Sequence, residues 1–81
     1  MERRIGTVLI LVHSKENIHQ LNDIVSNHGD IIIGRQGISL KEKSINIISL
    51  VLEGTTDEIG SLTGQLGRLH GITVKSVLAK Q

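Results

Sequence analysis

The sequence predicts an α+β fold in which two strand–helix–strand units build one four-stranded antiparallel sheet with two helices on one face. The first observation is an internal repeat: the apolar pattern of residues 18–25 recurs at 59–66, an offset of 41 positions (59 minus 18). The second is that an Ile/Leu/Val run precedes each copy, and a His-Gly pair and another strand-like segment follow it. The resulting order, βαββαβ, is that of a ferredoxin-like sandwich.

The first unit begins with a strand over residues 5–12, which is apolar almost throughout. Ser14 is placed to cap a helix from about residue 15 to 27. The buried stripe of this helix, at helical spacing, consists of Ile18, Leu21, Ile24 and Val25. Gly29 follows the helix, and we expect it to adopt a left-handed cap.

The next strand spans residues 30–40. Gly34 and Gly37 interrupt it, and glycine inside a strand often marks a bulge or a close backbone approach. Residues 41–43, Lys-Glu-Lys, predict a charged hairpin. A third strand over 44–53 then completes the hairpin.

The second helix begins with a predicted capping box, because Thr55 and Glu58 have the required spacing. It extends to about residue 69. Its core face consists of Ile59, Leu62, Leu66 and Leu69. Gly71 ends this helix, and the fourth strand spans residues 72–78.

Composition limits the functions that this chain can have. It carries no cysteine, proline or aromatic residue, and its net charge is +1. It therefore cannot form a disulfide or stack nucleic-acid bases, and it offers no electrostatic footprint for direct DNA binding. No apolar run reaches membrane-span length, and we identify no signal peptide. We expect a single cytoplasmic domain over residues 1–81, with 79–81 as a short tail and no membrane partner.

The side chains predict neither a metal site nor an enzyme. The four histidines form no H-x-H or H-x3-H pair. His28 and His70 occupy matching helix ends, and His13, entering the first strand-to-helix loop, is the best functional candidate. We expect no metal and no cofactor. No nucleophile–base pair can be assigned. The segment 34–38 superficially resembles the acylphosphatase phosphate loop but lies in the wrong strand, which disfavours a small hydrolase.

Two predicted strands are apolar on both faces. In each, one set of aliphatic side chains alternates with a second. The sets are Val8, Ile10, Val12, Ile48, Leu50 and Leu52 on one side, and Ile5, Leu9, Leu11, Ile45, Ile47 and Val51 on the other. Because helices cover one face only, we expect the second to be covered by self-association, as a homodimer or homotetramer through the sheet face or edge. The alternative is a set of tolerated surface aliphatics.

Three glycines form a narrow stripe on the second helix, opposite its leucines: Gly60, Gly64 and Gly67. Together they cost about 2–3 kcal/mol relative to alanine. Two interpretations remain open. Either a backbone or a ligand packs closely against the stripe, or the helix is weak and held by its leucines alone.

Four segments, 34–38, 44–53, 56–69 and 71–76, resemble the family of iron-only hydrogenase system regulators. The resemblance covers nearly the whole chain. It implies an ACT-like domain, similar to the C-terminal ligand-sensing domain of nickel-responsive regulators, that acts as a stand-alone regulatory domain. The nickel-binding histidines and cysteine of those regulators are missing here, so nickel sensing is not implied. Residues 1–4 are too short for a DNA-binding arm, so any role in transcription would need a partner or be indirect.

ACT-like domains usually bind small molecules such as amino acids at subunit interfaces. The resemblance therefore implies two groups of ligand-binding residues. They are His13, Ser14, Glu16 and Asn17 in the first strand-to-helix loop, and Gly34, Arg35 and Gly37 across the interface. Two functions stay open: a sensor of a small ligand, and a ligand-free structural or adaptor oligomer.

Overall fold

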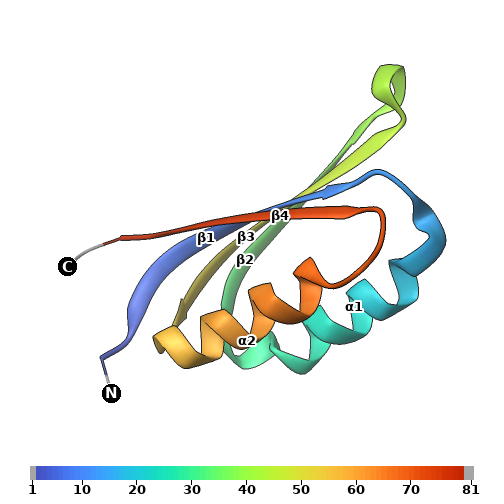
Figure 1. The fold of residues 1–81 in the computed structure, drawn as a ribbon. Coiled ribbons are helices and arrows are strands. Elements are labelled where there is room, and N and C mark those ends of the chain that lie inside the picture. The colour runs from blue at the N-terminus through green and yellow to red at the C-terminus, as the bar shows by residue number, and fades with distance from the viewer. Residues whose placement is uncertain (1, 80–81) are drawn as a thin grey trace.

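The computed structural model describes residues 2–79 and confirms the βαββαβ order (Figure 1). The elements are β1 (Arg4–Val12), α1 (Ile18–Asn27), β2 (Ile32–Leu40), β3 (Ile45–Gly54), α2 (Thr56–Gly67) and β4 (Ile72–Leu78). Of the predicted tail, residues 80 and 81 lie outside the described part, whereas the Ala79 N–H donates a 2.8 Å hydrogen bond to the Ile5 carbonyl.

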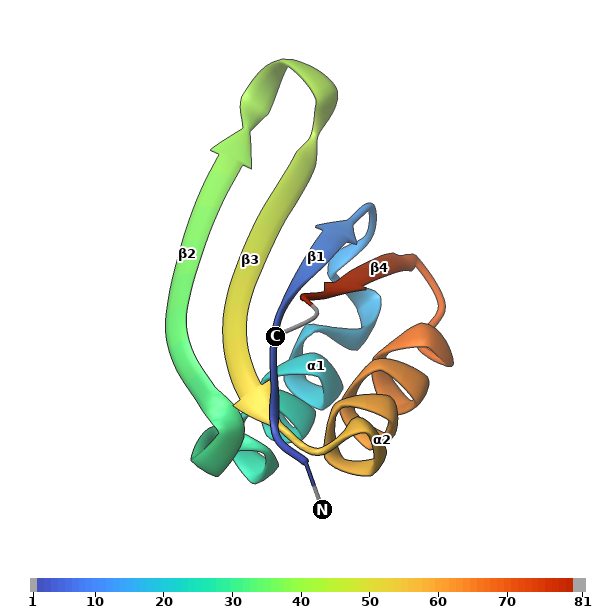
Figure 2. The same ribbon diagram turned by 90° about the vertical axis from the view of Figure 1, so that its left-hand side faces the viewer.

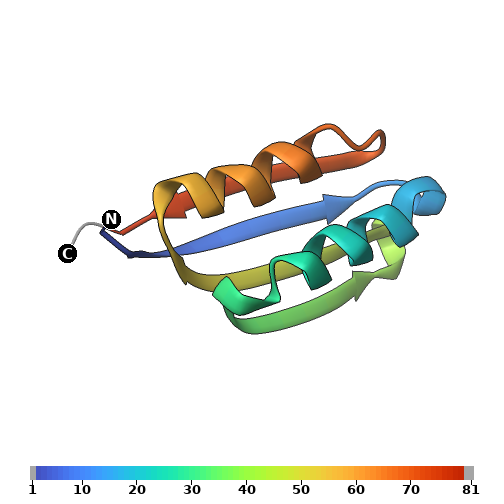
Figure 3. The same ribbon diagram turned by 90° about the horizontal axis from the view of Figure 1, so that it is seen from below.

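The four strands form one antiparallel sheet in the order β2-β3-β1-β4. Both helices cover the same face of this sheet, as Figure 3 shows. The ferredoxin-like prediction is therefore confirmed. Within residues 2–79, no helix has both the length and the apolar character needed to cross a bilayer.

The core lies between the sheet and the helices, and it is made only of aliphatic side chains. The buried residues are Val8, Ile10, Val12, Leu21, Val25, Ile31, Ile48, Leu50, Leu52, Ile59, Leu62 and Leu66. In the register of β1 and β3, Val8 lies opposite Leu50 and Ile10 opposite Ile48, so one alternation of each strand faces the helices. Ile18 and Ile24 pack at the rim of this core and remain half-buried.

The two helices begin differently. At α2 the predicted capping box is present: Glu58 N–H donates to Thr55 Oγ1 at 3.1 Å, and Thr55 N–H donates to the Glu58 carboxylate at 2.8 Å. That second hydrogen bond holds the pKa of Glu58 below its usual value. The first helix is not regular from residue 15. A 3-10 turn, Lys15–Asn17, comes first, because Ser14 Oγ accepts the N–H of Glu16, only two residues on.

Gly29 was expected in a left-handed cap, and this prediction is wrong. The chain continues from α1 into a 3-10 turn, Gly29–Ile31, in which Ile31 N–H donates to the His28 carbonyl. This turn buries Ile31 in the core, which is why β2 starts at Ile32 and not at residue 30. The left-handed glycine is Gly71, with φ +81°, at the end of the second helical segment.

Gly71→Ala should destabilise the fold, whereas Gly29→Ala should be nearly neutral. An added Cβ at Gly71 would lie 2.8 Å from the Ser14 Cβ in a left-handed conformation, which costs about 1–2 kcal/mol before the clash is counted. An added Cβ at Gly29 meets no heavy atom within 4 Å. Urea unfolding of the two variants measures the difference, and equal stabilities would contradict this account of the loop.

Candidate functional site

The loop between β1 and α1 is attached to the loop between α2 and β4. The Asn17 side-chain amide donates to the His70 carbonyl at 3.0 Å. The Glu16 carboxylate lies 3.4 Å from His70 Nδ1. The two loops are therefore joined at this end of the sheet. We call this joint between residues 13–17 and residues 70–73 the clamp. The sequence placed Glu16 and Asn17 in a candidate site but did not predict His70 as their partner.

His13 and Ser14 contribute to the same clamp. The His13 backbone N–H donates to the Gly71 carbonyl at 2.8 Å, and its Nε2 lies 3.0 Å from Thr73 Oγ1. Ser14 packs against Gly71, which has no side chain to prevent the approach. The structure thus brings together all four loop residues of the predicted site.

The second group of predicted ligand residues lies on β2, at the opposite edge of the sheet. A bulge between Ile32 and Gly34 confirms the predicted irregularity, whereas Gly37 pairs regularly with Ile48. Arg35 Nη2 lies 3.5 Å from the Asn22 side-chain oxygen on α1. Because β3 and β1 separate β2 from β4, these residues and the clamp can share a ligand only if they come from different copies of the chain.

The face of the sheet that carries no helix is rich in exposed aliphatic side chains. Register and alternation place on it Ile5, Leu9, Leu11, Ile38, Leu40, Ile45, Ile47, Val51 and Val77. We call this set the bare face. Leu9 and Val51, on the two central strands, are 43% and 44% exposed. The sequence identified this face on β1 and β3, and the structure extends it to β2 and β4.

The glycine stripe of α2 points into open space. Gly60, Gly64 and Gly67 are exposed, and an added Cβ at any of them meets no heavy atom within 4 Å. No described part of the chain therefore packs against the stripe. Close packing against it remains a prediction about another molecule.

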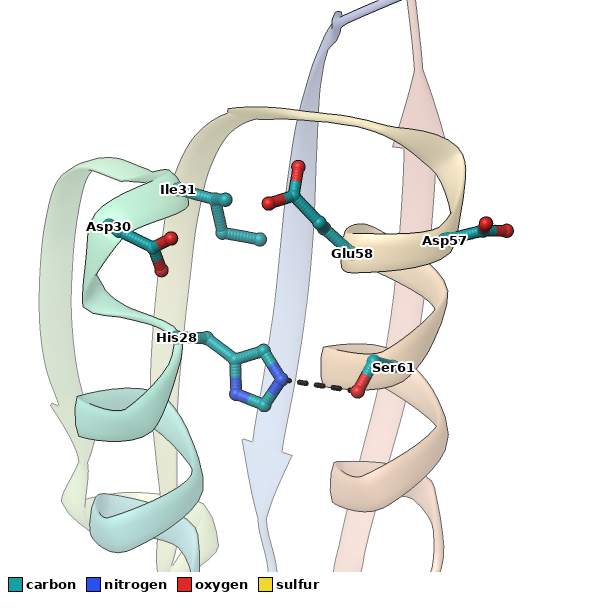
Figure 4. A pocket seen from close by; sticks show the side chains of 6 residues that line it. All are labelled: His28, Asp30, Ile31, Asp57, Glu58 and Ser61. Carbon is teal, nitrogen blue, oxygen red and sulfur yellow. Dashed lines mark hydrogen bonds between the residues drawn. The ribbon is translucent and has the colours of Figure 1, made fainter. Parts of the chain in front are cut away.

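A shallow hollow of about 370 Å³ lies where the end of α1 approaches the start of α2 (Figure 4). Its lining consists of His28, Asp30, Ile31, Asp57, Glu58 and Ser61. Within residues 2–79, no group of three or more His, Cys, Asp or Glu side chains is arranged to hold a metal ion.

The hollow contains a serine–histidine contact that the sequence did not reveal, because the two residues are 33 positions apart. His28 Nδ1 donates to the Ile24 carbonyl at 2.7 Å, which assigns Nε2 as the acceptor of the Ser61 hydroxyl at 3.3 Å. An imidazole oriented in this way can activate a hydroxyl. The carboxylates of Asp30 and Glu58 border the same hollow, however, and they disfavour any anionic intermediate there.

Comparison with known proteins identifies one family. Residues 4–76 match the family described as "TM1266-like: Iron-only hydrogenase system regulator, putative". No curated protein matches the chain. The solved structure of the protein TM1266 from Thermotoga maritima is 35% identical in sequence, with a TM-score of 0.92. That match covers 98% of this chain and 100% of the other.

More distant structures share the fold alone. The C-terminal domain of the MgtC protein from Mycobacterium tuberculosis is 12% identical, with a TM-score of 0.68, and the match covers 94% of this chain and 87% of that domain. CPII, a nitrogen regulatory PII-like protein from Thiomonas intermedia K12 whose structure contains ADP, AMP and bicarbonate, is 11% identical. Its TM-score is 0.56, with 99% of this chain and 96% of the other covered.

Gly64→Ala tests the glycine stripe. Because the new methyl group enters open space, the variant should raise the stability of the chain by about 0.5–1 kcal/mol in urea unfolding. Gly54→Ala is the opposite control, since a Cβ there would lie 3.1 Å from Ile31 Cγ2 and should destabilise. If Gly64→Ala instead dissociates an oligomer in light scattering, a second molecule packs on the stripe, and the predicted gain in stability is wrong.

Proposed function

The chain belongs to the TM1266-like family of iron-only hydrogenase system regulators, and from this premise we propose that residues 1–81 form one ACT-like regulatory domain that works as a homo-oligomer without catalysing a reaction. A small molecule such as an amino acid binds at its subunit interface, and assembly or docking on a partner protein conveys the signal.

The bare face is the observation that carries this proposal. Helices bury one alternation of β1 and β3, and Figure 1 shows both helices on the same side of the sheet, with no helix of the described chain on the other. The two longest dimensions of the chain, 40 and 20 Å, bound a face of roughly 800 Å² (40 × 20). A standard-size protein interface buries about 800 Å² on each partner. Two copies can therefore cover each other through this face around a two-fold axis.

Ligand binding between copies is supported by the separation of the two residue groups. The clamp offers the Glu16 carboxylate and the Asn17 amide, and the β2 edge of another copy offers the Arg35 guanidinium. A guanidinium pairs with a carboxylate in a bidentate way, and a carboxylate pairs with an ammonium. This combination suits an amino acid.

A ligand-free adaptor is the second candidate, and a specific observation favours it. His13, Glu16 and Asn17 already have partners in the clamp, so a ligand would have to displace or join these contacts. In the adaptor, the clamp only fixes the geometry of the domain, and the bare face serves assembly alone.

Leu9→Lys should dissociate the oligomer. Leu9 lies in the middle of the bare face, and burying an unpaired ammonium costs about 3–5 kcal/mol, so association should weaken at least about 100-fold in light scattering or analytical ultracentrifugation. His19→Lys is the matched control, because His19 is exposed on α1, in the other layer. A wild-type chain that stays monomeric at high concentration contradicts the proposal.

Arg35→Gln should remove amino-acid binding without dissociating the oligomer. Calorimetric titration of the standard amino acids should give heat with the wild type and with Arg68→Gln, an exposed arginine just after α2, but not with Arg35→Gln. An assembled wild-type protein that gives no heat with any amino acid would favour the adaptor.

A further inference from the structure

The β2–β3 hairpin extends beyond the ends of β1 and β4, as Figure 2 shows. The register explains this projection: β1 ends where Val12 pairs with Asn46, whereas β2 and β3 remain paired as far as Leu40 and Ile45. The 3-10 turn Lys41–Lys43 closes the hairpin. Beside its base, the first turn after β1 brings Lys15 against the two strands.

A hollow of about 290 Å³ lies at this junction. Its lining comes from four separate elements of the chain. The residues are Lys15, Ser39, Leu40, Lys41, Ser44, Ile45 and Asn46. Two lysines, two serines and one asparagine are the polar residues of this lining, and Leu40 and Ile45 are its apolar residues. Every charged residue in this lining is positive.

No carboxylate is among the described residues that line this hollow. Glu16 follows Lys15 in the chain, but its carboxylate lies 3.4 Å from His70 in the clamp. Glu42, at the hairpin turn, lines an adjoining hollow together with Lys43, and that hollow shares Ser39, Leu40 and Lys41 with this one. The hollow at the helix ends shows the opposite character, with Asp30, Asp57 and Glu58 in its lining. In a chain with a net charge of only +1, this separation of sign marks the hairpin hollow as the place for an anion.

We propose that the hollow at the base of the β2–β3 hairpin binds the phosphate group of a small phosphorylated molecule. Lys15 and Lys41 supply the countercharge, and the Ser39 and Ser44 hydroxyls and the Asn46 amide donate hydrogen bonds to the phosphate oxygens. Lys15 lies in the clamp segment 13–17, but no other clamp residue lines the hollow, nor does Arg35, and the site does not depend on the proposed amino-acid sensing.

The site also adjoins the bare face. Leu40 and Ile45 pair with each other in the register, and both belong to that face. Ser39 and Asn46 alternate with them, so their side chains face the other side of the hairpin. Anion binding and the proposed assembly therefore use opposite sides of the same hairpin.

The test is a nuclear magnetic resonance titration of the full-length, ¹⁵N-labelled protein with pyrophosphate and with AMP. Adenosine serves as the probe without a phosphate group. We expect concentration-dependent shifts of the Ser39, Ser44 and Asn46 amides with both anions, and no such shifts with adenosine. The affinity should fall as sodium chloride is added, because salt screens exposed charges.

Lys15→Gln and Lys41→Gln should each weaken pyrophosphate binding by about three- to fivefold, the range of an exposed ion pair, and the double variant by about tenfold. Lys43→Gln is the matched control, because it removes the same charge from the same hairpin without lining this hollow, and it should change the affinity less than about twofold. Circular dichroism checks that each variant is folded.

The proposal fails if neither anion shifts these amides. It also fails if Lys43→Gln weakens binding as much as Lys15→Gln, which would indicate a diffuse charge effect, or if adenosine produces the same shifts as AMP. None of these readouts involves amino-acid binding, so the result is independent of the function proposed above.

Discussion

The structure depends on one constraint: the two central strands are apolar on both sides, and two helices can cover only one side. Val8, Ile10 and Leu50 face the helices and are fully buried. Leu9 and Val51, next to them in the same strands, face the other way and are almost half exposed. A domain of this size buries only about 60–65% of its unfolded surface, and apolar side chains that stay exposed add nothing to the burial that stabilises the fold. The proposed self-association would bury these side chains.

The clamp between the two crossover loops is the second determinant of the architecture. It joins the start of α1 to the start of β4 through the backbone of His13 and the side chain of Asn17. Gly71 makes this approach possible, because its left-handed backbone and missing side chain let Ser14 pack directly against it. The loop that we propose as part of a ligand site is therefore also a structural joint.

Positive and negative side chains are concentrated at different places on the protein, although its net charge is small. Positive side chains meet at the base of the β2–β3 hairpin, and negative ones meet between the ends of the helices. The bare face lies between the two edges of the sheet and carries few charges. The two proposals use separate surfaces, the bare face for assembly and the hairpin hollow for a small ligand.

The sequence alone determined the order of the elements, the buried faces and the capping box at Thr55, because these follow from local periodicity and from contacts three or four residues apart. It also indicated both alternations of β1 and β3. It misassigned the left-handed glycine, because Gly29 and Gly71 occupy equivalent places in the repeat and only the packing of Ile31 and Ser14 distinguishes them. Only the tertiary structure brought Ser61 to His28, His70 to Asn17 and Lys15 to the hairpin, because these contacts join segments far apart in the chain whose approach depends on how the helices and strands pack.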